Sequence, residues 1–191
     1  MTTVRRGPVF FWSFAGFPES GVSMIEFQKI TDAEGLSSIR AIADEVWPET
    51  FAPILSPEQI AYMMEMMYAP QVMADELAQG YTFEIVRIDG EDAGYLVCSP
   101  YHDDIMKIHK VYLRSRFHGC GVGQAILEEA QRIARSYGFK RVRLNVNKQN
   151  FRAIKAYERN GFCTVESVKN PIGNGFFMDD FVMEKSLGEK E

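Results

Sequence analysis

The sequence has no apolar run approaching the ~20 residues that a membrane-spanning helix requires. Cysteine is also scarce. Cys98, Cys120 and Cys163 are odd in number, lie far apart and include no Cys-x-x-Cys pair. This pattern argues against a disulfide framework or a zinc site and suits a reducing compartment. We therefore expect a cytoplasmic protein with no membrane segment and no metal site.

Basic residues show no excess, because 21 Lys and Arg stand against 26 Asp and Glu, for a net charge of −5. Nucleic-acid binding usually needs a clustered basic face, so we expect no nucleic-acid partner. The remaining composition is that of an ordinary globular protein, with 46% hydrophobic residues in a chain of 191. One α/β domain with its own core is the simplest organisation for this length.

The first 23 residues differ from the rest of the chain. Arg5 and Arg6 precede an apolar stretch at 9–17 that weakly resembles a secretory signal. Glycine and serine interrupt that stretch, and no A-x-A cleavage site follows it. We interpret residues 1–23 as a flexible leader or extension, with an export signal as the alternative. Residues 24–188 are the expected domain.

Apolar periodicity and turn signals predict the elements of that domain. Strands are expected at 25–30, 81–88, 93–98, 105–113, 141–147, 162–168 and 177–185. Helices are expected at 33–46, from Pro57 to about Tyr68, from Pro70 to near Gly80, at 122–137 and at 151–160. Breaks are expected at Pro48, at the Asp89-Gly90 hairpin turn and in a loop at 170–175. The order predicts one mixed sheet with flanking helices.

A glycine-rich loop joins the strand at 105–113 to the helix at 122–137. Its glycines let the backbone approach a ligand, and its N–H groups with the helix N-terminus suit a pyrophosphate. A Walker P-loop is excluded because no Gly-Lys-Ser/Thr is present. A dinucleotide fold fits poorly, since Lys140 and Arg141 stand where an acidic residue is needed. A plain glycine turn stays open as an alternative.

Two registers of this loop are similar to a known cofactor signature: Arg or Gln, two residues, Gly, one residue, then Gly or Ala. Residues 116–121 match it literally, and residues 118–123 match it with His118 in the first position. The second register is preferred because Val111-Tyr112-Leu113 stands at the signature's usual spacing from His118. The chain in this region resembles the GNAT superfamily of N-acetyltransferases.

The stronger likeness follows at 144–162. An apolar strand, Asn150, Ala153, Tyr157 and Gly161-Phe162 stand at the offsets of the second GNAT cofactor motif. Helical spacing places the first three of these on one helix face. Two motifs in the right order are far more specific than either alone.

The resemblance implies an α/β (α+β) fold, a single GNAT-type domain with a mixed, mostly antiparallel sheet of about seven strands and four to five helices. It implies acetyl-CoA as co-substrate, an amine as acceptor and direct transfer between them in a ternary complex. The fourth and fifth strands are expected to splay apart and admit the pantetheine arm. The residues that the resemblance assigns to the cofactor are Val111, Tyr112, Leu113, His118, Gly119, Cys120, Gly121, Val122, Gly123, Gln124, Asn150 and Tyr157.

Two side chains are candidates for catalysis. Tyr157 is expected to protonate the departing thiolate, with simple packing against the sheet as the alternative. Relatives often place a Glu base on the central strands, but Lys107 and Asn145 occupy those positions here. Alternation would put His109 on the same strand face as Lys107, Val111 and Leu113, and imidazole titrates near neutrality, so His109 is the candidate base. A structural histidine is the alternative, and Glu84 is a further candidate.

The acceptor is expected to be a small amine. Segments 47–51 and 56–59 are loosely similar to bacterial polyamine acetyltransferases, and several acidic residues could attract a cation. These are Glu45, Glu49, Asp103, Asp104, Asp179 and Asp180. A solvated acidic surface, a protein-modifying acetyltransferase and a catalytically silent acyl-CoA-binding module stay open. A homodimer is possible through the final hairpin, with Phe176, Phe177 and Phe181 as contacts or as core.

Overall fold

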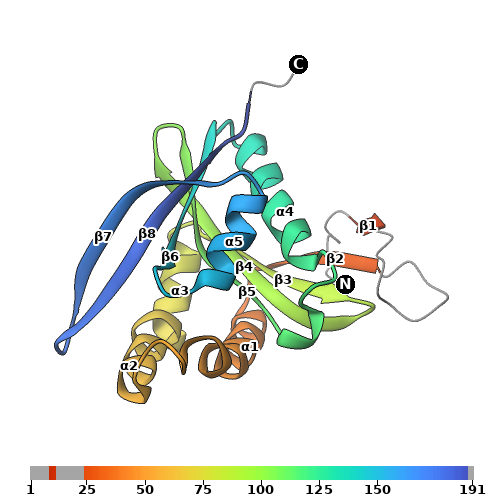
Figure 1. The fold of residues 1–191 in the computed structure, drawn as a ribbon. Helices are drawn as coiled ribbons and strands as arrows, with labels where there is room; N and C mark the ends of the chain where they lie inside the picture. Colours follow the sequence, from red (N-terminus) through yellow and green to blue (C-terminus); the bar gives the residue numbers. More distant parts are fainter. Residues whose placement is uncertain (1–8, 12–23, 189–191) are drawn as a thin grey trace.

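The computed structural model describes residues 9–11 and 24–188, which form an eight-stranded sheet in the order β1-β2-β3-β4-β5-β6-β8-β7 (Figure 1). The strands are β1 (Val9–Phe11), β2 (Met24–Ile30), β3 (Thr82–Ile88), β4 (Glu91–His102), β5 (Ile105–Leu113), β6 (Arg141–Asn147), β7 (Cys163–Gly173) and β8 (Phe176–Ser186). All neighbours pair antiparallel except β5 and β6, which run parallel. The predicted mixed, mostly antiparallel sheet is confirmed.

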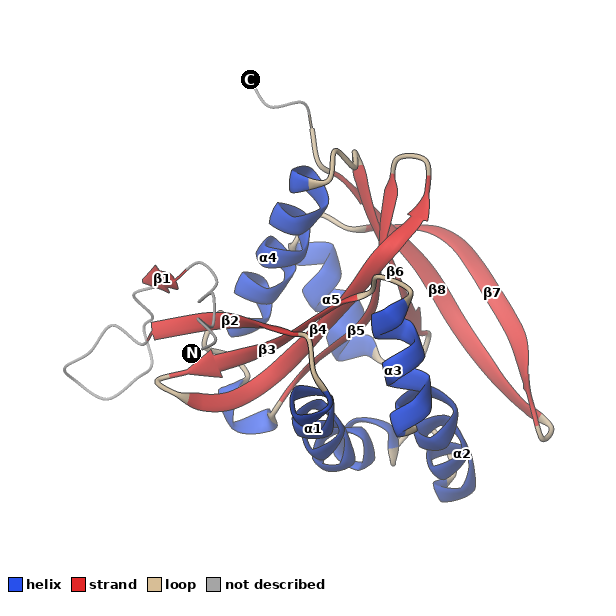
Figure 2. Ribbon diagram, turned by 180° about the vertical axis from the view of Figure 1, so that it is seen from behind, coloured by secondary structure: helices blue, strands red, loops and turns tan. Residues whose placement is uncertain are grey.

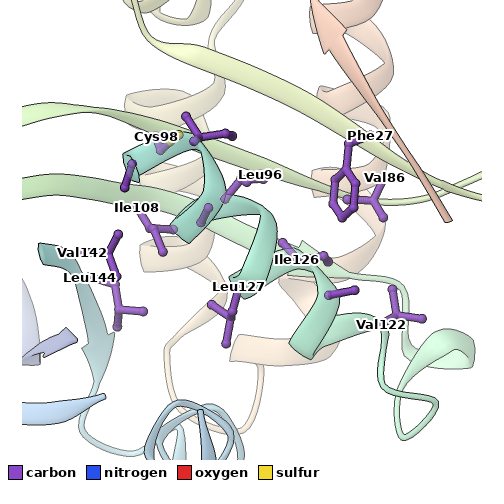
Figure 3. Packing of buried hydrophobic residues seen from close by; sticks show 14 of the residues in the cluster. Phe27, Val86, Leu96, Cys98, Ile108, Val122, Ile126, Leu127, Val142 and Leu144 are labelled. Carbon is purple, nitrogen blue, oxygen red and sulfur yellow. The ribbon is translucent and has the colours of Figure 1, made fainter. Parts of the chain in front are cut away.

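Helices cover both faces of the sheet (Figures 1 and 2). They are α1 (Ala33–Phe51), α2 (Pro57–Tyr68), α3 (Pro70–Ala78), α4 (Val122–Ser136) and α5 (Phe151–Arg159), with a 3₁₀ turn at Ser115–Phe117. One core cluster lies between the sheet and α4, and Figure 3 shows Ile126 and Leu127 of α4 against strand residues such as Leu96. A second cluster joins α1, α2 and α3 to the opposite face. The sheet therefore separates an α4/α5 face from an α1/α2 face.

Local signals set many boundaries as expected. Ser56 accepts a hydrogen bond from the N–H of Gln59 and caps α2, whose first residue is Pro57. Asp89 and Gly90 both take positive φ, 51° and 84°, which matches the twist that a two-residue hairpin requires. These boundaries depend on residues close to one another in the chain.

The prediction that Pro48 ends the first helix is wrong, because α1 continues through Pro48 to Phe51. The N–H of Ala52 bonds to the carbonyl of Pro48 at 3.0 Å, so the helical pattern resumes beyond the proline. A proline inside a helix costs ~3 kcal/mol. Trp47 and Phe51 are 1% and 7% exposed, and burial of these two large side chains offsets that cost.

The predicted loop at 170–175 is also mostly strand. β7 runs to Gly173, and only Asn174 and Gly175 form the turn, with φ of 49° and 76°. Likewise β4 extends beyond the predicted end at Cys98 to His102. Long hairpin pairing outweighs the weak strand propensity of these polar residues, because each added pair closes a ladder hydrogen bond.

The central strands separate as expected. β5 pairs with β6 only from Ile105↔Arg141 to Ile108↔Leu144, so the later residues of both strands are unpaired with each other. β5 also carries a β-bulge, since Val97 faces Lys110 while Cys98 faces Ile108, which leaves His109 as an extra residue. The split and the bulge together shape the site described below.

The expected leader lies mainly outside the described residues. Within it, Val9–Phe11 forms β1 and pairs antiparallel with β2. Among the helices of the described region, none combines the length and apolar character that crossing a membrane demands.

Candidate active site

A cavity of about 890 Å³ runs through the split between β5 and β6. On the α4/α5 face it is lined by the glycine loop, the start of α4 and one side of α5. On the α1/α2 face it is lined by α1, α2, β5 and the end of the β7–β8 hairpin. The two halves are called here the loop half and the acceptor half.

The loop half begins at an uncapped helix terminus. Gly119 and Gly121 have φ of 84° and 79°, and Gly121 is the N-cap of α4 without any side-chain cap bond. The first turn of α4 holds no acidic residue, and no side chain caps its free N–H groups. Both glycines, together with Gly123 and Gln124, line the cavity. Main-chain N–H groups and the helix dipole therefore suit a phosphate ligand.

Two loop residues turn their side chains away from the cavity. Val122 is 1% exposed and belongs to the core beneath α4 (Figure 3). Cys120 packs against the same core, and its Sγ lies 3.7 Å from the carbonyl oxygen of His118. Neither lines the cavity, so only their main chain can serve a ligand there.

His118 ties the loop to the end of β5. Its Nε2 lies at 2.8 Å from the carbonyl oxygen of Leu113, in hydrogen-bond distance, and its ring lines the cavity. Burial and the charge of Arg152 lower the pKa of the imidazole. His118 therefore holds the loop in place as an uncharged side chain near neutral pH.

α5 presents the second motif to the cavity. Asn150 caps the helix, since its Oδ1 accepts from the N–H of Ala153 at 3.2 Å. Asn150, Ala153 and Tyr157 all line the cavity, so the predicted helix face is the one that meets it. Burial raises the pKa of Tyr157 to about 12, which keeps the phenol protonated at neutral pH.

The acceptor half has apolar walls with few charges. Its lining includes Trp47, Phe51 and Leu55, with Met63 and Met67 from α2 and Tyr112, Phe177 and Met178 from β5 and β8. Trp47 donates from Nε1 to the hydroxyl of Tyr68 at 2.9 Å, and its ring lies 5.6 Å from that of Tyr112. Within the described part of the chain, the carboxylates on the cavity wall are Glu49, which is exposed, and Asp180, which is buried.

Residues 37–162 match the family described as the Acetyltransferase (GNAT) family, which spans both the loop and α5. The chain belongs to the GNAT family. GNAT proteins use acetyl-CoA as co-substrate, and the uncapped glycine loop beside split strands fits its pyrophosphate and arm. The protein is an acyl-CoA-dependent N-acetyltransferase, as its motifs predicted.

Named GNAT relatives cover nearly the whole domain. An uncharacterized N-acetyltransferase of Mycobacterium tuberculosis is 30% identical over 159 residues, covering 83% of this chain and 99% of the relative. A spermidine N(1)-acetyltransferase of Thermoplasma acidophilum is 26% identical over 165 residues, covering 84% and 96%. The crystal structure of the PaiA N-acetyltransferase from T. acidophilum in complex with coenzyme A superimposes with a TM-score of 0.72 at 25% identity, covering 85% of this chain and 98% of that one.

His109 lies in a different environment from the one that alternation predicted. Because of the bulge, Ile108, Val111 and Leu113 face the α4 core, whereas His109 stacks on Tyr81 at 4.7 Å toward α1/α2. Its Nε2 lies 2.8 Å from the hydroxyl of Ser99. Burial, then Lys107 and Lys110, lower its pKa to about 3. At the cavity wall it is thus a neutral and weak proton acceptor rather than one that titrates near pH 7.

Glu84 lies on the α4 face of the sheet, away from the cavity lining. It is 6% exposed, and burial followed by the charge of Glu129 raises its pKa to about 7. Its Oε2 has no hydrogen-bond partner among the described residues. Glu84 is therefore a buried structural carboxyl in this GNAT protein and is remote from the acceptor half.

Several cavity residues escaped the sequence analysis. Arg152 and Arg159 on α5 line the loop half and carry the positive charge that phosphates attract. Their spacing of seven residues places them on one helix face, and this signal was available beside the Asn150 motif. In the acceptor half, the sequence had already singled out segments 47–51 and 56–59, but the complete apolar wall combines residues of α1, α2, β5 and β8 that no single local pattern links.

Proposed function

We propose that the protein transfers the acetyl group of acetyl-CoA to a small primary amine, with a polyamine-like amine as the leading candidate. One observation carries this proposal: the acceptor half is an apolar chamber with a buried carboxylate on its wall. Such a chamber suits methylene groups that end in a cation. The similarity to a spermidine acetyltransferase supports the same class.

The outer wall of the chamber favours a small molecule over a protein chain. The tip of the β7–β8 hairpin lies beside α2 (Figures 1 and 2). Gln59 donates to the carbonyl of Phe177 at 2.8 Å, and Tyr62 donates to the carbonyl of Ile172 at 2.6 Å. The rings of Tyr62 and Phe176 also pack together in a tilted arrangement, with their centroids 5.6 Å apart. These contacts join the hairpin to α2 along one side of the chamber, which supports a small acceptor.

Acetyl-CoA supplies a thioester whose carbonyl accepts the amine. The main chain of Val111, Tyr112 and Leu113 borders the split, and we propose that it binds the pantetheine arm of acetyl-CoA. One N–H of this segment would polarise the thioester oxygen. A donor of this kind contributes ~3 kcal/mol to the transition state. The N–H groups from Gly119 to Gln124 hold the pyrophosphate, Asn150 contacts the arm, and Tyr157 protonates the departing sulfur.

The test is release of free thiol from acetyl-CoA across a panel of polyamines, simple alkylamines, amino acids, aminoglycosides and peptides. We expect turnover with small amines, highest among those with an alkyl chain. Activity confined to peptides would instead favour a protein N-terminal or lysine acetyltransferase. Binding of acetyl-CoA without turnover on any acceptor would indicate a silent acyl-CoA-binding module.

The homodimer remains a prediction. Of the three aromatic residues proposed as its contact, Phe177 is 45% exposed, Phe176 packs against Tyr62, and Phe181 packs against the α4 core. β7 is an outer strand of the sheet and is largely exposed, so a contact between copies would involve its free edge.

A further inference from the structure

Two adjacent carboxylates on β8 have opposite surroundings. Asp179 is 46% exposed and forms an ion pair with Lys148. Asp180 is 8% exposed, lines the cavity and forms no ion pair with any residue of the described ranges 9–11 and 24–188. Alternation along the strand turns Asp180 toward the chamber together with Met178.

Asp180 lies at the level of the strand split. In the β6–β8 register it faces Asn147, which is three residues beyond Leu144, the last residue of β6 to pair with β5. Burial is the main cause of the raised pKa of Tyr112 on β5, and the negative charge of Asp180 adds a smaller contribution. The carboxylate is thus placed beside the opening through which the two halves of the cavity meet.

The charges around Asp180 come from β5, from β8 and from the residue that follows β6. Lys107 on β5 and Lys148 after β6 are cations within reach, and Asp179 on β8 is an anion. Burial is the main reason why the pKa of the Asp180 carboxyl lies above its ordinary value. The side chain of Asn145 opposes this rise. A carboxylate of raised basicity that lacks an ion-pair partner is free to take a proton.

We propose that Asp180 accepts the proton that the acceptor's ammonium must lose before attack. This proposal rests on the proposed function, since it requires an amine in the acceptor half. Asp180 is then the catalytic base, and it also draws the cationic end of the substrate toward the split.

In the proposed step the nitrogen of the acceptor loses two protons and forms one bond to carbon. The ammonium gives one proton to Asp180, and the freed electron pair of nitrogen forms a bond to the thioester carbon. The carbon–sulfur bond breaks with its electron pair on sulfur, which takes the proton of Tyr157. The nitrogen returns a second proton to Tyr157, and Asp180 releases its proton to water. The products are an amide, free thiol and one proton.

The other candidate bases fit this step less well. Glu84 is on the α4 face and does not line the cavity. His109 is engaged with Ser99 and stacked on Tyr81. Asp180 alone combines burial, a place on the acceptor wall and a negative charge among the described residues.

The principal test compares Asp180→Asn with Asp179→Asn, a matched change one residue away on the exposed side. For an alkylamine we expect Asp180→Asn to lower kcat/KM about 100-fold or more and to remove the acidic limb of the pH–rate profile. The affinity for acetyl-CoA should stay within about twofold, which also verifies the fold. Asp179→Asn should retain the wild-type profile. Asp180→Glu should restore an acidic limb at a shifted pH, which a structural role would not do.

A second arm varies the basicity of the acceptor. A fluorinated alkylamine that is already uncharged at neutral pH needs no base, so Asp180→Asn should impair it far less than the parent amine. Equal losses with both amines would overturn the proposal. Retention of the acidic limb in Asp180→Asn, or its loss in His109→Ala instead, would overturn it as well. Wild-type protein that binds acetyl-CoA but acetylates no amine would refute the proposed function itself.

Discussion

Burial keeps the Tyr157 phenol protonated, as its proposed role as the acid requires. Tyr157 lines the cavity, and its pKa of about 12 keeps the phenol proton in place across the neutral range. We predict that Tyr157→Phe lowers kcat about tenfold or more and leaves the affinity for acetyl-CoA within about twofold. Steady-state kinetics measures kcat, and calorimetric titration measures the affinity for acetyl-CoA. Tyr137→Phe, at a residue 63% exposed, is the control, and an unchanged kcat in Tyr157→Phe would exclude the phenol as the acid.

Glu84 should make stability depend on pH. Its pKa is about 7 in the folded protein against an ordinary 4.5, so the folded state holds more protons between these values. Stability therefore falls as pH rises from about 4.5 to 7 and stays lower above that range. We predict that Glu84→Gln is more stable than wild type by about 1–3 kcal/mol at pH 8 and gains little at pH 5.

Denaturant unfolding at the two pH values checks this prediction. Glu65→Gln on α2 is a suitable control because the Glu65 side chain is 72% exposed, and its change should be small at both pH values. An equal effect of Glu84→Gln at pH 5 and pH 8 would show that desolvation of the carboxylate is not the cause.

At the scale of the elements, a substitution at the start of α4 should change helix stability and cofactor binding in opposite directions. A Cβ at Gly123 would meet no protein atom within 4 Å, and the residue lines the cavity. Gly123→Ala should therefore stabilise the helix by ~0.5–1 kcal/mol. The same methyl group would occupy space at the proposed pyrophosphate site and should weaken acetyl-CoA binding about tenfold.

The comparison is Gly80→Ala, where φ is 90° and the site is away from the cavity. Strain there should lower stability by ~1 kcal/mol without any change in acetyl-CoA affinity. Thermal unfolding gives the stability of each variant, and titration gives its affinity for acetyl-CoA. Tighter or unchanged binding in Gly123→Ala would place the pyrophosphate elsewhere.

At the scale of the whole molecule, the split sheet should make stability depend on the cofactor. β5 and β6 share only their first four residue pairs, so a ligand in the split connects two parts of the sheet. We predict that acetyl-CoA at about 100 times its dissociation constant adds ~2.7 kcal/mol to the free energy of unfolding. For a domain of this size that corresponds to a rise of about 5–10 °C in Tm. Absence of a shift at saturating ligand would contradict binding in the split.

Much of this architecture could be predicted from the sequence because its signals are local. Gly121 and Gly161 adopt the positive φ that only glycine takes easily, and the Ser56-Pro57 start and the Asp89-Gly90 turn act within a few residues. The spacing of Asn150 and Tyr157 needed only helical periodicity to bring both to one cavity wall.

Tertiary structure decided what depends on residues far apart in the chain. Burial of Trp47 and Phe51 stabilises the part of α1 that continues beyond Pro48. The bulge of β5 opposite β4 turns His109 to the other face of the sheet from the one that alternation predicted. Likewise, the register with β6 brings Asp180 to the split, and the packed core sets the pKa of Glu84. Strand register and desolvation are properties of the assembled sheet, so no single segment of sequence contains them.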